Sequence, residues 1–320
     1  MRTRRSQSSS DPVSSVLSST LGVKHRSVLL HEAVEMLAIH ANDTVVDATL
    51  GGAGHAHAMA DRLGVEGTLI GFDLDEDALL RARLALEDSK PHTHVVKANF
   101  RNLAQELHTL GISEVDKVLF DLGWSSYQHD VGRGFSFQKD EPLLMTYEKN
   151  PGPGAVTARV IVNEWKEESI ADILWGWGEE RYSRRIAKAI VERRSQKSIE
   201  TPVDLSEIIQ AAVPFAYRRG RLHPATRTFQ ALRIAVNDEL GALRQGLDSA
   251  FEKLRSGGRI AVITFHSIED RLVKQTFAKW HMEDKGERVT KKPITATSEE
   301  LKVNPRARSA KLRFFQKKSK

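Results

Sequence analysis

The chain has 320 residues, of which 40% are hydrophobic and 28% are charged, and its formal net charge is +6. This composition is typical of a folded globular protein, and no apolar run approaches the roughly 18–20 residues that a membrane helix needs. The absence of cysteine excludes disulfides, thiolate metal sites and a cysteine nucleophile, and it fits a reducing compartment. The length predicts about two structural units.

The first 24 residues differ from the rest in composition. They contain eight serines and three arginines, and Asp11 is their one acidic residue. Such a segment buries too little apolar surface to offset the entropy lost on ordering, so we expect residues 1–24 to be disordered. We expect a cytoplasmic protein. An Arg- and Ser-rich start with few acids also fits an organellar transit peptide, and this alternative stays open.

Short β-rich apolar segments alternate with helical periodicity from Lys24 onward. This alternation is typical of an α/β fold with a mainly parallel sheet. The expected strands cover residues 44–47, 68–73, 95–96 and 118–121. Helices are expected after the first two strands, ending near Leu63 and covering residues 76–87.

The pattern changes after about Trp124. A turn-rich stretch is followed by helical periodicity over residues 170–177, 180–194 and 205–213. One long helix is expected over 225–254, ended by Gly257 and Gly258, and another buried strand over 259–265. Because the sheet resumes after this long interruption, we expect a helical insertion within a nucleotide-binding domain.

The first expected strand runs from Asp47 into a glycine turn, Gly51-Gly52-Ala53-Gly54. Such a turn lets the backbone approach a bound nucleoside, with helix-terminal N–H groups facing it. Asp73 ends the next strand, where a carboxylate typically accepts hydrogen bonds from both ribose hydroxyls. The pair predicts an adenosine-containing cofactor without specifying it, because the dinucleotide and phosphate-binding motifs are both absent. Asp47 either faces the charged end of that cofactor or is an ordinary loop carboxylate.

Two further strand ends carry polar residues at the edge where open α/β folds bind ligands. Asp121 follows the fourth strand, and the nearby Trp124 and Tyr127 either stack on an extruded base or pack under the insertion. After the last strand, Ser267 is expected to cap a helix together with Asp270. That leaves the neighbouring histidine, His266, without a structural role.

Positive charge is concentrated in two regions. Arg181, Arg184, Arg185 and Lys188 fall on one helical face, and residues 301–320 contain eight Lys or Arg and no acid. A polyanionic partner such as nucleic acid would explain both regions, and a solvated surface explains them equally well. The histidine pairs His55/His57 and His92/His94 lack a third converging ligand, so no metal site is predicted.

Several longer strings are similar, in the same order, to the motifs of the bacterial ribosomal RNA small subunit methyltransferase H family. They are HRSVLLHE (25–32), DATLGGAGH (47–55), DLG with Ser125-Ser126 (121–126), RGFSF (133–137), GEER (178–181), HPATRTFQ (223–230), FHSIEDR (265–271) and NPRARS (304–309). The resemblance spans about residues 24–316.

The resemblance implies an α/β fold of the class I (Rossmann-like) methyltransferase type with an inserted helical domain. Residues 25–126 and 233–320 would form a discontinuous S-adenosylmethionine-binding domain, and residues 127–232 an inserted domain that recognises RNA. It further implies methylation of the exocyclic amine N4 of a cytidine in small-subunit (16S) ribosomal RNA, near the decoding centre. The partner would be this RNA or the assembling small subunit.

By motif position, the resemblance also implies which residues contact the cofactor. They are Ala53, Gly54, His55, Asp73, Phe100, Asp121 and Gln128. The Phe100 ring either packs on the adenine or belongs to the core. Asp121 is the candidate catalytic residue, because it could orient the amine or the cofactor's reactive end.

The sequence departs from the family pattern at several positions. Residues 142–147 read PLLMTY where the family usually has PLDMRM, so an acid and a base are missing at Leu144 and Thr146. Trp124, Tyr127 and Ala53 also replace a smaller aliphatic residue, a proline and a glycine. If the missing acid holds the target amine, the alternative is a catalytically weakened rRNA-binding or ribosome-assembly factor. A methyltransferase for proteins or small molecules is a third hypothesis, which the basic regions disfavour.

Overall fold

The computed structural model describes residues 26–123, 132–148, 151–152 and 154–319. The predictions made for residues 1–24, Trp124, Tyr127 and Gln128 lie outside these ranges, as does the proposed boundary at 126/127. No helix within the ranges is both long and apolar enough to cross a membrane.

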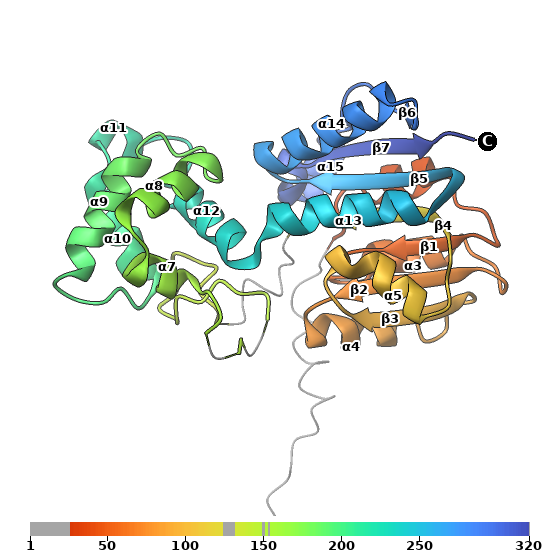
Figure 1. Cartoon of the computed structure of the whole chain (residues 1–320), viewed down its shortest axis with the longest axis horizontal. Coiled ribbons are helices and arrows are strands. Elements are labelled where there is room, and N and C mark those ends of the chain that lie inside the picture. Colours follow the sequence, from red (N-terminus) through yellow and green to blue (C-terminus); the bar gives the residue numbers. More distant parts are fainter. Residues whose placement is uncertain (1–25, 124–131, 149–150, 153, 320) are drawn as a thin grey trace, which may run out of the picture.

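A seven-stranded sheet lies at the centre of the described structure, in the order β3-β2-β1-β4-β5-β7-β6 (Figure 1). Its strands are β1 (Thr44–Asp47), β2 (Thr68–Asp73), β3 (His92–Lys97), β4 (Val115–Asp121), β5 (Leu254–Thr264), β6 (Gly286–Arg288) and β7 (Lys311–Lys317). Strands β1 to β5 are parallel, whereas β7 pairs antiparallel with β5 and with β6. This order is that of class I methyltransferases, and it confirms the predicted fold class.

The central strands are buried on both faces, which explains their nearly continuous apolar sequences. In β1, Val45 belongs to one hydrophobic cluster and Val46 to the other, because successive side chains point to opposite faces. Helices α2 (Leu30–Leu37), α3 (Gly54–Ala60) and α4 (Glu76–Ala85) cover the first face. Helices α5 (Leu103–Thr109), α13 (Glu239–Lys253) and α14 (Ser267–Met282) cover the second.

A group of helices with its own hydrophobic cluster lies beside the sheet (Figure 1). It contains α7 (Ala158–Glu164), α8 (Glu167–Gly176), α9 (Ser183–Arg194), α10 (Pro202–Ala212), α11 (Phe215–Arg218) and α12 (Thr226–Asn237). The stripe of cations predicted on α9 is exposed at Arg184, Arg185 and Lys188. Helix α12 continues through the boundary proposed at 232/233, so that boundary stays a prediction.

The single helix predicted over 225–254 is wrong, because Asp238 separates α12 from α13. Its backbone is left-handed, with φ 46° and ψ 46°, a conformation that aspartate tolerates better than most residues. The Arg101 guanidinium donates to the Asp238 carbonyl and carboxylate at 3.2 and 3.0 Å, which holds the bend. Gly257 and Gly258 do not end the helix either, since α13 ends at Lys253 and both glycines lie inside β5.

The basic tail is largely a strand of the sheet. Lys311 and Arg313 of β7 both donate to Asp270, and Lys317 donates to two backbone carbonyls. Upstream of the strand, α15 (Ser298–Val303) and a 3-10 helix (Pro305–Ser309) leave three cations exposed: Lys302, Arg306 and Arg308. Only part of the tail's predicted positive charge is therefore available to a partner.

Candidate active site

Three aspartates end neighbouring parallel strands and meet at one edge of the sheet: Asp47 on β1, Asp73 on β2 and Asp121 on β4. Two adjoining cavities open at this edge. Residues that line both of them include Thr49, Gly51, Asp121 and Glu269. The position of Asp121 between the cavities places it where two bound molecules would meet.

Asp73 lies in the smaller cavity and is anchored by backbone groups. Its Oδ2 accepts from the Gly51 N–H and its Oδ1 from the Asp75 N–H, both at 2.9 Å. These bonds fix the carboxylate and leave each oxygen a further lone pair for a hydroxyl donor. Burial raises the pKa of Asp73, because the charged form loses hydration, so a ligand that donates hydrogen bonds there would be favoured.

Phe100 forms an apolar wall of the same cavity. Its ring is half-buried and meets Phe120 edge-on, with ring centroids 5.5 Å apart at an interplanar angle of 89°. Helix α13 comes so close that a Cβ on Gly246 would lie 2.7 Å from the Phe100 ring. The ring is therefore held in place beside Asp73, as an adenine-binding wall requires, while its contact with adenine stays a prediction.

The glycine turn leads from the smaller cavity into the larger one. Gly51 lines both cavities, and Gly54 and His55 line the larger. A Cβ at position 54 would lie 2.1 Å from the Ser27 Oγ, so any other residue there would force the Ser27 hydroxyl to move. Ala53 adopts a left-handed φ of 60° and is buried in the core, and it is not among the described residues that line either cavity.

Asp121 and His55 form a close pair at the junction. The His55 Nδ1 lies 3.4 Å from the Asp121 Oδ2, and the side chains are 6% and 19% exposed. The Asp121 Oδ1 and the Asp47 Oδ2 are both buried, and neither has a hydrogen-bond partner among the described residues. Burial and then the charge of Asp47 raise the pKa of Asp121 to about 8, and burial raises that of Asp47 to about 7.

These shifts predict a pH dependence of stability. The folded-state pKa of Asp47 lies above its ordinary value of 3.8, so the folded protein binds this proton more tightly than the unfolded chain does. The contribution of Asp47 to the free energy of unfolding is therefore complete below about pH 4 and is lost as the pH rises through about 7. We expect Asp47→Asn to remove about 2–3 kcal/mol of the decline between pH 5 and pH 8. Urea unfolding at pH 5 and pH 8 measures it, and equal slopes in both proteins would contradict the assignment.

The larger cavity has a volume of about 600 Å³ and an aromatic wall. Phe135, Phe137 and Phe229 line it. His223 stacks on Phe137, with ring centroids 4.3 Å apart and an interplanar angle of 6°, and Phe229 meets Phe137 edge-on. Arg26, Arg306 and Ser309 lie at the same cavity. A flat ring bearing a phosphate group matches this combination of aromatic and cationic side chains.

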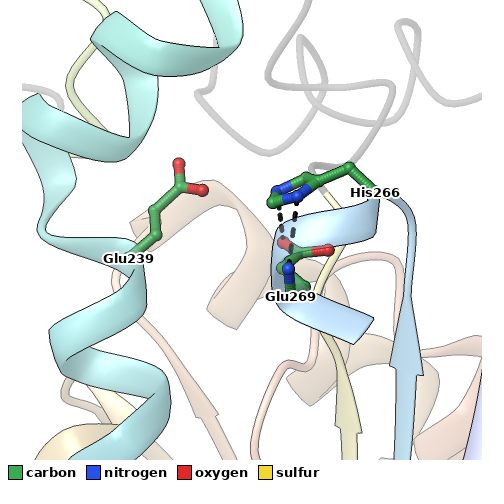
Figure 2. A group of neighbouring side chains, drawn as sticks. All are labelled: Glu239, His266 and Glu269. Atoms are coloured by element: carbon green, nitrogen blue, oxygen red, sulfur yellow. Dashed lines mark hydrogen bonds and ion pairs between the residues drawn. The ribbon is translucent and has the colours of Figure 1, made fainter. Parts of the chain in front are cut away.

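Glu239, His266 and Glu269 gather beside the cavities, and their potential ligand atoms lie within 4.8 Å of one another (Figure 2). Arg233 already donates to both oxygens of Glu239, at 2.7 and 2.9 Å, and the Tyr147 hydroxyl donates at 2.7 Å. A divalent cation would have to displace this guanidinium. We interpret the cluster as a charge-balanced network.

The helix cap predicted at Ser267 is wrong. His266 is the N-cap of α14, and its Nδ1 accepts from the Glu269 N–H at 3.4 Å. Ser267 instead donates to Glu179, which also accepts from Arg271, both at 2.6 Å, so this loop of the helical group is tied to α14. The structure thus assigns His266 the structural role expected of the serine.

Leu144 and Thr146 are not among the described residues that line the cavities, although Met145 and Tyr147 between and beside them are. The residues of the site that sequence reasoning missed are Arg233, Glu239 and Glu269. Glu269 lies inside the FHSIEDR string, a signal that could have been used, whereas Arg233 and Glu239 come together only because the chain bends at Asp238.

Comparison with known proteins gives matches over most of the chain. The MraW methylase family matches residues 22–318. A ribosomal RNA small subunit methyltransferase H from Symbiobacterium thermophilum is 48% identical over 305 residues, covering 90% of this chain and 95% of that protein. A protein of the same name from a Paenibacillus species is 46% identical, covering 92% and 99%. A solved rRNA methylase from Streptococcus thermophilus is 11% identical, with a TM-score of 0.44, covering 93% and 100%.

Proposed function

Because the chain belongs to the MraW methylase family, we propose that it transfers a methyl group from S-adenosylmethionine to the exocyclic N4 amine of a cytidine in small-subunit ribosomal RNA. The observation that carries this proposal is the pair of cavities that meet at Asp121. One is suited to a nucleoside and the other to a flat base.

The smaller cavity fits the adenosine part of the cofactor. Asp73 would accept from the ribose hydroxyls, Phe100 would pack on the adenine, and the glycine turn would guide the charged end towards the junction. When bound, S-adenosylmethionine supplies a methyl group on a positively charged sulfur. Burial raises the pKa of Asp47 to about 7 and that of Asp121 to about 8, so a positive charge bound near them would favour their ionised forms, which would then balance it.

The larger cavity would hold the target base after it leaves its stack in the RNA. The amine then forms the new N–C bond as the S–C bond breaks with its electron pair on sulfur, and the nitrogen loses one proton. Positioning supplies most of the acceleration, because the nitrogen must lie about 3 Å from the methyl carbon. Asp121 is placed to accept a hydrogen bond from the amine, and this role is part of the proposal.

The exposed cations of α9 and the 3-10 helix would bind the RNA backbone. We propose the assembling small subunit or its RNA as partner, and a cytoplasmic location follows from that substrate. The bacterial relatives support this location and lend nothing to the organellar alternative.

Replacing Arg184, Arg185 and Lys188 by alanine should weaken RNA binding and reduce its salt dependence. Each lost phosphate contact lowers the slope of log affinity against log salt by about 1, so the triple variant should lose up to about 3. Fluorescence anisotropy with small-subunit RNA from low to high salt measures the slope. Lys90→Ala serves as the control, because Lys90 is an exposed cation just before β3, at the end of the strand opposite the candidate site. Identical slopes for the triple variant and the native protein would show that the cations of α9 do not bind the RNA backbone.

The weakened assembly factor remains the second candidate, because Leu144 and Thr146 depart from the family pattern. Their absence from the described cavity walls weakens that argument. In the deciding experiment, the protein is incubated with ribosomal small subunits from a strain that lacks its gene and with methyl-labelled cofactor. The RNA is then digested to nucleosides. We expect label in N4-methylcytidine. Tight RNA binding without label would favour the assembly factor.

A further inference from the structure

We propose that Asp121 and His55 act together as the proton acceptor for the target amine, with the proton shared between the Asp121 Oδ2 and the His55 Nδ1. This inference rests on the proposed function. It deepens that function by assigning the fate of the proton, which the transfer reaction itself leaves open.

The contacts of His55 define where its protons lie. Its Nε2 is 3.1 Å from the Val28 carbonyl oxygen, and a carbonyl can only accept, so Nε2 must carry a proton. The other ring nitrogen, Nδ1, faces the Asp121 Oδ2 at 3.4 Å. Two lone pairs facing each other would repel, so the pair is stable when one further proton is shared between Nδ1 and Oδ2.

Asp121 and His55 both line the larger cavity, in which the amine would react. The Asp121 Oδ1 is buried without a partner among the described residues, and Asp121 lines both cavities. Among the described residues, the titratable groups that face Asp121 are Asp47 from β1, His55 from α3 and Glu269 from α14. The two acids disfavour its ionisation and the histidine can favour it, which makes the proton affinity of the pair sensitive to any new charge.

A cationic methyl donor would shift that balance. With the sulfonium in place, the pair loses its shared proton to solvent and carries one negative charge beside one positive charge. On transfer the sulfur becomes neutral, the amine nitrogen releases one proton, and Asp121 and His55 share that proton. Charge is conserved, and the affinity of the pair for a proton rises at the moment the nitrogen loses one.

Proton release on binding tests this coupling without measuring turnover. We expect calorimetry in buffers of different ionisation enthalpy, near pH 7, to show release of about one proton when S-adenosylmethionine binds. S-adenosylhomocysteine, the same molecule without the charge, should release almost none. Asp121→Asn should abolish the difference between the two ligands. Asp61→Asn, which changes an exposed carboxylate just past α3, should retain the difference.

The pH profile of single-turnover methyl transfer gives the second readout. The native rate should rise about tenfold per pH unit below the apparent pKa of the pair and then level off. His55→Gln should shift the pH range over which the rate rises, whereas His57→Gln should leave that range unchanged. His57 is a matched control, because it lies on the same helix as His55 and its Nδ1 is also 3.4 Å from an aspartate oxygen, that of Asp61. Both of these side chains are exposed to solvent.

Equal proton release for the charged and neutral ligands would overturn the inference while leaving the proposed function intact. An unchanged pH range for the rise in rate in both Asp121→Asn and His55→Gln would do the same. If neither ligand bound at saturating concentration, the proposed function itself would fail, and the proton assignment would fail with it.

Discussion

Replacing Asp73 with asparagine is expected to weaken the binding of S-adenosylmethionine about 100-fold. The carboxylate would accept from two ribose hydroxyls, and each hydrogen bond to a charged acceptor contributes about 1.5–3 kcal/mol. An amide keeps the shape but loses the charge and presents an NH₂ group to one donor. Isothermal titration calorimetry measures the change.

Two controls separate this effect from a loss of folding. The Asp73 oxygens also accept from the backbone N–H groups of Gly51 and Asp75, so thermal unfolding must show that the turn is retained. Asp61→Asn, an exposed carboxylate just past α3, should leave affinity unchanged. Affinity within threefold of the native protein in a folded Asp73→Asn variant would exclude the ribose contact.

Replacing Arg233 with methionine is expected to lower the free energy of unfolding by about 3–5 kcal/mol. Arg233 and Glu239 are 12% and 11% exposed, and the guanidinium contacts both carboxylate oxygens. Removing one partner of a buried ion pair leaves the other charge uncompensated, which costs far more than losing a surface pair. Burial acts to lower the pKa of Arg233, but the charge of Glu239 outweighs it and raises that pKa, so Arg233 stays protonated at any practical pH.

Urea unfolding measures this loss, and Arg244→Met supplies the comparison. Arg244 is an exposed residue of α13, so its replacement should change the free energy of unfolding by about 0.5 kcal/mol or less. The double variant Arg233→Met with Glu239→Gln should recover part of the stability, because no uncompensated charge remains. Equal destabilisation by Arg233→Met and Arg244→Met would contradict a buried ion-pair network at the bend between α12 and α13.

The sheet and the anchoring residues of the site could be predicted from sequence because both depend on local pattern. Strands β1 and β2 have the predicted bounds, and Asp73 and Asp121 end their strands as expected. A carboxylate at the end of a parallel strand lies at the ligand-binding edge whatever its loop does. Predicting the ends of the strands was therefore enough to predict that Asp73 and Asp121 lie at the ligand-binding edge.

The bend at Asp238 could not be predicted in the same way. Aspartate and the following glutamate are compatible with a continuous helix, and the left-handed conformation depends on a tertiary contact with Arg101. Without the bend, Arg233 and Glu239 would not have been expected to meet Tyr147 from the inserted region. This part of the site is a product of packing.

Two other features had signals in the sequence. In β7 the apolar residues Leu312, Phe314 and Phe315 indicated a buried strand, but only the positive charge of this region was interpreted. At α14 a serine is the commoner N-cap, so Ser267 was preferred over His266. In both places tertiary partners decided the outcome.

A structure of the protein with S-adenosylhomocysteine and cytidine tests the central claim most directly. We expect the ribose of the cofactor product on Asp73, its sulfur at the junction, and the cytosine amine facing Asp121 from the larger cavity. A nucleoside bound away from Asp73, or a cytosine whose amine points away from Asp121, would contradict the account.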